Sequence, residues 1–202
     1  MTDETDIAYM RRLAEEASTV PMRGGSILMS AGLIYGLTSM AHWTVVSGLI
    51  SIDPQAFSLI WLGATLLFLG VLAIIIAGLK REGGVQTAAN RASAVAWSSV
   101  GWGIFALFTS IAVVSMRIGE QSLVLLSLVP SIIMVFYGLG WAVTAAMMRT
   151  QSLWWLAIAS FAAAPLLALL GGEPAQYLAY GVALFVLMAL PGYLLMRQAK
   201  QA

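Results

Sequence analysis

The sequence predicts an all-α integral membrane protein: six transmembrane helices in an antiparallel bundle, preceded by a short cytoplasmic amphipathic helix. Two observations predict this class. Of the 202 residues, 60% are hydrophobic and only 9% are charged, whereas soluble domains carry roughly 25% charged residues. The apolar residues also gather in six segments, each near the roughly 20 residues that an α-helix needs to cross a bilayer.

The six predicted spans cover residues 26–50, 57–79, 93–116, 123–148, 153–170 and 176–196. Backbone polar groups in hydrocarbon must be satisfied within each segment, so we expect every span to be helical. Short connectors with turn residues, such as Asp53-Pro54, place consecutive helices side by side and antiparallel. The fifth span is the weakest prediction, because it is the shortest and contains Pro165.

The transmembrane domain is expected at residues 25–197, between a cytoplasmic tail at 1–24 and another at 198–202. The first tail is acidic and lacks the order of a secretory signal, so we expect none. Its apolar residues recur at helical spacing: Ile7, Met10, Leu13, Ala14 and Ala17. This pattern predicts a helix lying on the cytoplasmic membrane surface; a helix that docks a partner protein is the alternative.

The basic residues predict the orientation. Nine of the ten fall on one side of the predicted spans: Arg11, Arg12, Arg23, Lys80, Arg81, Arg91, Arg149, Arg197 and Lys200. Only Arg117 falls on the other side. Because cytoplasmic loops carry the excess of Lys and Arg, both termini are expected in the cytoplasm. As a separate expectation, the membrane is a bacterial inner membrane.

Aromatic residues fit the same frame. Four are expected near the outer boundary of the membrane: Trp43, Trp61, Tyr177 and Tyr180. Another four are expected near the inner boundary: Trp97, Trp154, Trp155 and Tyr193. Amphipathic rings settle at these interfacial depths, so they are most simply interpreted as anchors.

His42 is the one ionisable His, Lys, Arg, Asp or Glu side chain inside the predicted spans, since every acid, Lys and Arg lies in a tail or loop. Intramembrane charges normally mark proton relays and ion coupling. A carboxylate-driven antiporter, a voltage sensor and a Schiff-base retinal protein are therefore disfavoured. The chain has no Cys and a net charge of +1, so we expect no thiolate chemistry, no metal or other cofactor, and no nucleic-acid partner.

Polar and aromatic residues at similar predicted depth define a candidate ligand cleft. Tyr35, Thr38, Ser39 and His42 share one face of the first span at three- and four-residue spacing. The remaining members lie on the third and fourth spans: Trp102, Thr109, Ser110, Ser127, Ser131 and Tyr137. We expect His42 to face these two spans and to pair with one of their hydroxyl groups.

Two interpretations of this set stay open. The hydroxyls can simply bond to carbonyls four residues back, with His42 finding one partner and the aromatic rings filling the bundle. Alternatively, the three spans line an outward-facing polar cleft in which His42 is the titratable group. The choice depends on which way each stripe faces.

Small residues predict where helices approach closely. Gly32 and Gly36 form a GxxxG motif, which in a polytopic protein more often serves internal packing than dimerisation. Pro191 frees a backbone carbonyl near the end of the last span, and with Gly192 it is the best candidate for a hinge.

Three functions are consistent with these features. The leading hypothesis is a non-enzymatic protein that binds or transports a neutral or apolar small molecule without carboxylate-based ion coupling. The second is a regulatory or assembly subunit that contacts another membrane protein, or a second copy of itself, through its helices. The third, an intramembrane enzyme using His42 as a base, is disfavoured because neither a matched acid nor a nucleophile accompanies the histidine.

Overall fold

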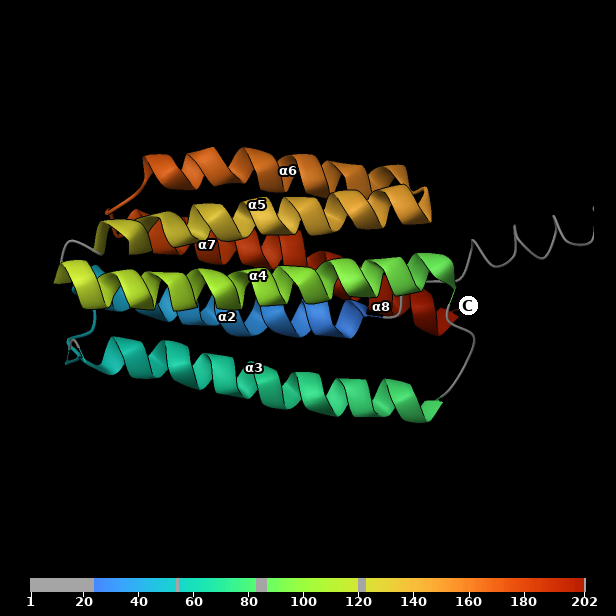
Figure 1. Ribbon diagram of the computed structural model, residues 1–202, viewed down its shortest axis with the longest axis horizontal. Coiled ribbons are helices and arrows are strands. Elements are labelled where there is room, and N and C mark those ends of the chain that lie inside the picture. Colours follow the sequence, from blue (N-terminus) through green and yellow to red (C-terminus); the bar gives the residue numbers. More distant parts are fainter. Residues whose placement is uncertain (1–23, 54, 83–86, 120–122, 202) are drawn as a thin grey trace, which may run out of the picture.

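The computed structural model describes residues 24–53, 55–82, 87–119 and 123–201, and these form a helical bundle without strands (Figure 1). Its elements in chain order are α2 (Gly25–Val46), α3 (Gln55–Glu82), α4 (Ala88–Ile118), α5 (Leu123–Met148), α6 (Gln151–Leu169), α7 (Ala175–Leu184), the π-helix η2 (Phe185–Ala189) and α8 (Leu190–Gln201). The last three run on without interruption as one long helix. The amphipathic helix predicted near the N-terminus lies outside the described residues.

Five helical stretches are long and apolar enough to cross a membrane, so the protein is a multi-pass membrane protein. They are Ser58–Arg81, Ala88–Ile118, Val124–Met148, Gln151–Leu169 and Ala175–Ala199. The fifth predicted span, despite Pro165, is among them. The first, expected over 26–50, is not: it forms α2, which ends at Val46 and carries several polar residues.

The helix α2 packs against the last helix through glycines. A Cβ atom added to Gly32 would lie within 2.8 Å of the Cα atom of Ala189 in η2, and one added to Gly36 would lie 3.1 Å from the ring of Phe185. Gly192 of α8 meets α2 in the same way, at the backbone of Met29. The prediction that the GxxxG motif serves internal packing is therefore confirmed, since only glycine lets these backbones come so close.

The long last helix changes geometry before Pro191. Proline has no N–H, so the carbonyl of Leu187, four residues earlier, loses its usual backbone donor. The chain forms the wider π-helix η2 at this point. The indole nitrogen of Trp141 on α5 donates to the Leu187 oxygen at 3.0 Å. The freed carbonyl is thus bonded by a side chain from another helix, and the hinge at Pro191 stays a prediction.

The centre of the bundle is α5, whose Met134, Trp141 and Ala145 have no exposed surface. It packs on α6 along its length and on α4 along its other side. At one end, the buried Gln176 of α7 donates from Nε2 to two carbonyl oxygens, that of Ser127 on α5 at 2.6 Å and that of Leu167 on α6 at 3.0 Å. This one amide therefore ties three helices together.

The helix α3 is the least buried part of the bundle. Only 6% of its most apolar stretch is buried, compared with 44% for α5. Its main packing partner is α2, and Figure 1 shows it along the edge of the bundle. Gly63, Gly70 and Gly78 on α3 have open space where a Cβ atom would be. Most of α3 therefore faces the surroundings of the bundle and not other helices.

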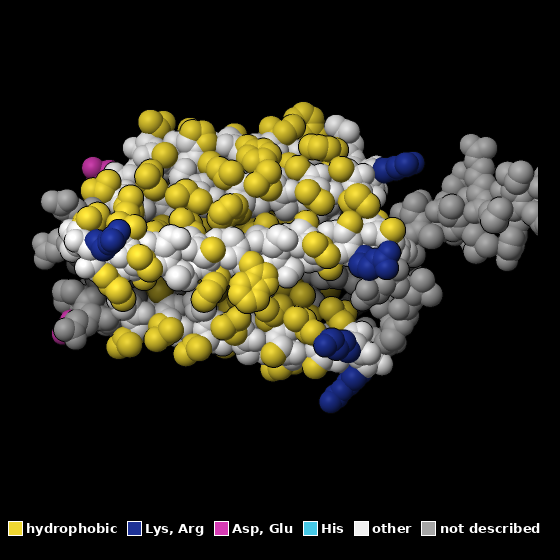
Figure 2. Space-filling view, viewed as in Figure 1, with side chains coloured by type: hydrophobic (Ala, Val, Ile, Leu, Met, Phe, Trp, Pro, Cys, Tyr) yellow, Lys and Arg dark blue, Asp and Glu magenta, His cyan; other side chains and the backbone are white. Residues whose placement is uncertain are grey.

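Basic side chains gather at one end of the bundle, which we call the basic end (Figure 2). The described residues there are Lys80, Arg81, Arg91, Arg149 and Arg197. Arg117, Asp53 and Glu173 belong to the opposite end, where α4 ends and where α2 and α6 are followed by turns. The described basic residues that the sequence predicts on one side of the spans therefore lie at one end of the bundle.

Candidate functional site

The imidazole of His42 lies at the junction of three helices. Trp61 on α3 donates from its indole nitrogen to Nδ1 of His42 at 2.9 Å. The imidazole also stacks on the ring of Tyr177 from α7, with ring centroids 3.8 Å apart and planes 23° from parallel. Because Nδ1 accepts a hydrogen bond, the neutral imidazole here carries its proton on Nε2.

Further aromatic rings extend this contact along α2 and α3. Tyr35 stacks on Trp61 at 6.4 Å between centroids and meets Phe68 at 5.5 Å. The side chains of Tyr35 and Thr65 are hydrogen-bonded to each other. We call Tyr35, His42, Trp61, Phe68 and Tyr177 the His42 cluster. Through these rings α3 contacts α2, and α2 contacts α7.

The two hydroxyl residues between Tyr35 and His42 are buried but bond differently. Thr38 donates to the carbonyl of Ile34, four residues back, at 2.7 Å. Ser39 donates across the helix interface to the carbonyl of Tyr177, also at 2.7 Å. The polar stripe predicted on α2 therefore does face protein, and Ser39 fixes the position of α7 against it.

The expected partners on α4 face away from this junction. Trp102 is 69% exposed, Thr109 and Ser110 are exposed as well, and Thr109 donates to the carbonyl of Phe105 on its own helix at 2.9 Å. The contacts shown for His42 are with Trp61 on α3 and Tyr177 on α7, and not with the residues expected on the third and fourth spans. The ligand cleft between the first, third and fourth spans stays a prediction. A hydroxyl that bonds to its own helix can face lipid, so its polarity does not fix the rotation of the helix.

The three residues expected on α5 make different contacts. Ser127 donates to the carbonyl of Val124 on the same helix at 2.7 Å, and Ser131 donates to the carbonyl of Ala164 on α6 at 2.5 Å. Tyr137 is buried, and its ring lies near that of Trp97 on α4, with 6.1 Å between the ring centroids.

Sequence reasoning missed Trp61 and Tyr177 as partners of His42. Both were predicted near the outer boundary, but a shared depth does not show that the second and sixth spans are the neighbours of His42. Gln176 was also missed, because one glutamine at a helix start carries no pattern. Among the described residues, no group of three His, Cys, Asp or Glu side chains is placed to hold a metal ion.

Comparison of the chain with protein-family models, with curated proteins and with solved structures gave no match. The membrane-spanning helices and the His42 cluster are therefore the features from which a function is inferred.

Proposed function

We propose that this chain is a six-span protein of the cell membrane, with both termini in the cytoplasm, that binds a neutral or apolar small molecule at the His42 cluster. In addition to the five stretches named above, we count α2, the first helix that the structure describes, as a span. Its 22 residues extend about 33 Å, enough to cross the hydrocarbon core of about 30 Å. Its polar Thr38 and Ser39 are buried against other helices, so α2 does not need the apolarity of a lipid-facing span.

The topology is tested with reporter fusions. Fusions at the N-terminus and after Gly83, Thr150 and Ala202 are expected to read cytoplasmic, and those after Asp53, Glu120 and Glu173 external, because the basic end stays inside. The pair that tests α2 is the N-terminal fusion and the fusion after Asp53. If both read on the same side, α2 does not span the membrane and this topology is wrong.

The observation that carries the binding proposal is the arrangement of rings at a weakly packed helix. His42 and Trp61 are half-buried, and α3, which supplies Trp61 and Phe68, is the least buried helix and packs mainly on α2. A small displacement of α3 would expose the stacked ring faces of the cluster and the hydrogen-bonded pair of His42 and Trp61 to a molecule dissolved in the membrane. Ligand sites of this kind are mostly apolar, with a few polar groups that set orientation.

This proposal predicts a co-purifying molecule that depends on Trp61. We expect mild-detergent purification from native membranes, followed by mass spectrometry of the extract, to recover a neutral small molecule with the wild type. Trp61→Leu should lose most of it, because the substitution removes both the ring and the donor to His42. Trp102→Leu is the matched control, since Trp102 is exposed on α4. Equal recovery from both variants, or none from the wild type, would contradict the proposal.

A second candidate function, a subunit that contacts another membrane protein, is favoured by the exposure of α3. Open glycines at Gly63 and Gly70 offer a face where a foreign helix could approach closely. The same purification separates the two candidates. A stoichiometric membrane protein that is lost with Gly63→Leu but kept with Trp61→Leu supports the subunit, whereas a small molecule with the opposite dependence supports the binding protein.

A further inference from the structure

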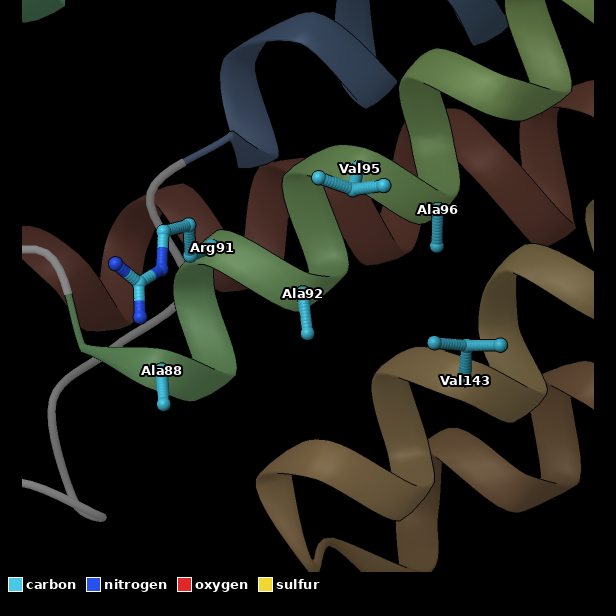
Figure 3. A pocket seen from close by; sticks show the side chains of 6 residues that line it. All are labelled: Ala88, Arg91, Ala92, Val95, Ala96 and Val143. Atoms are coloured by element: carbon cyan, nitrogen blue, oxygen red, sulfur yellow. The ribbon is translucent and has the colours of Figure 1, made fainter.

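A groove lies between α4 and α5 at the basic end, away from the His42 cluster. It has a volume of about 570 Å³ and is lined by Ala88, Arg91, Ala92, Val95, Ala96 and Val143. Figure 3 shows Ala88, Ala92 and Ala96 on successive turns of α4, turned towards Val143 of α5. The short alanine side chains line the groove on the α4 side and do not fill the space towards α5 at this end.

The groove is apolar along its length and charged at its end. Apart from the guanidinium of Arg91, its lining side chains are alanines and valines. Arg91 extends from the first turns of α4 near the end of the helix (Figure 3). This helix has 31 residues, about 46 Å of length, which exceeds the hydrocarbon thickness of about 30 Å. Its first turns therefore reach the level of the lipid headgroups.

The surrounding charge favours an anion. Lys80, Arg81, Arg149 and Arg197 belong to the same end of the bundle as Arg91. A guanidinium offers planar, paired donors that fit the oxygens of a phosphate. Basic pockets between membrane helices at a cytoplasmic face are suited to anionic lipid headgroups.

We propose that this groove binds an anionic phospholipid, with one acyl chain along Ala88, Ala92 and Ala96 and the phosphate on the guanidinium of Arg91. The apolar wall matches hydrocarbon and offers no groups for a peptide backbone, which would need hydrogen-bond partners. The charge at the end of the groove distinguishes this lipid from a zwitterionic one. The site is independent of the His42 cluster, so it can hold whether or not that cluster binds a ligand.

The test is native mass spectrometry of the purified full chain with added dioleoylphosphatidylglycerol or dioleoylphosphatidylcholine. We expect the wild type to retain one phosphatidylglycerol in preference to phosphatidylcholine. Arg91→Gln should lower phosphatidylglycerol retention about fivefold, the effect of one basic side chain near an anionic lipid, and leave phosphatidylcholine unchanged. Ala92→Trp, which fills the groove, should lower retention of both lipids.

Two controls make the outcome decisive. Arg197→Gln removes a cation from the same end but not from the groove, and it should leave retention near the wild-type value. Ala92→Leu is a milder filling variant, for use if the tryptophan variant is not monodisperse. If Arg197→Gln lowers retention as much as Arg91→Gln, or if neither filling variant lowers it, the lipid is held by diffuse charge and the groove is not its site.

Discussion

Replacing Gly32 by leucine is expected to prevent stable assembly of the bundle. The Cβ atom of any larger residue at this position would overlap the backbone and the side chain of Ala189. Overpacking in a tight core typically costs about 1–3 kcal/mol, and here the obstacle is backbone, which cannot rotate away. Gly32→Ala should therefore lower thermal stability in detergent measurably, and Gly32→Leu should lower it further or abolish the monodisperse protein.

The matched control is Gly63→Leu on α3, where a Cβ atom meets nothing within 4 Å. Both variants add the same side chain to a glycine inside a membrane helix, so their difference isolates the contact between α2 and η2. The measurement is the melting temperature by fluorescence-detected size-exclusion chromatography. Equal melting temperatures for Gly32→Leu and Gly63→Leu would mean that α2 and η2 do not cross as described.

The helices themselves could be predicted from the sequence because hydrocarbon leaves the backbone no alternative. The length of an apolar run and the need to satisfy each N–H and C=O determine a helix without reference to its neighbours. That is why even the segment with Pro165 forms a helix apolar enough to cross the membrane. The exception is α2, which is less apolar than the other spans and whose polar Thr38 and Ser39 are buried in the bundle.

The neighbours of His42 could not be predicted in the same way. Trp61 and Tyr177 contact His42 from the second and sixth predicted spans, and a predicted depth does not say which helices are adjacent. The sequence offers Thr109 as a partner for His42, yet its hydroxyl donates to a carbonyl of its own helix. Polar residues of this kind give no information on helix rotation, so a site between helices remains ambiguous until the packing is known.

The hydrogen bond between Trp141 and η2 is a second contact between helices that the sequence does not predict. Pro191 predicts that a carbonyl is freed, but not which side chain satisfies it. The donor lies 46 residues earlier in the chain, on α5, and nothing local in the sequence connects the two. The physical rule is nevertheless general: a carbonyl freed inside the bilayer needs a donor, and the surrounding helices must provide it.

Removing the indole N–H of Trp141 is therefore expected to destabilise the bundle, and more strongly while Pro191 is present. Trp141→Phe keeps a buried ring but leaves the carbonyl of Leu187 without its donor. An unsatisfied buried carbonyl costs about 1–3 kcal/mol, in addition to the volume lost at a fully buried position. In a Pro191→Ala background the backbone N–H of residue 191 becomes available to that carbonyl.

The same Trp141→Phe substitution should then cost less, by about 1 kcal/mol, a typical size for one hydrogen bond. Thermal unfolding of the four proteins in this cycle gives the coupling directly. Trp97→Phe is the control, because the Trp97 indole donates to the hydroxyl of Thr144 at 3.1 Å and not to the freed carbonyl; its cost should not depend on Pro191. Equal losses of stability from Trp141→Phe with and without Pro191 would show that the indole does not replace the missing backbone donor. The π-helix η2 would then need another cause.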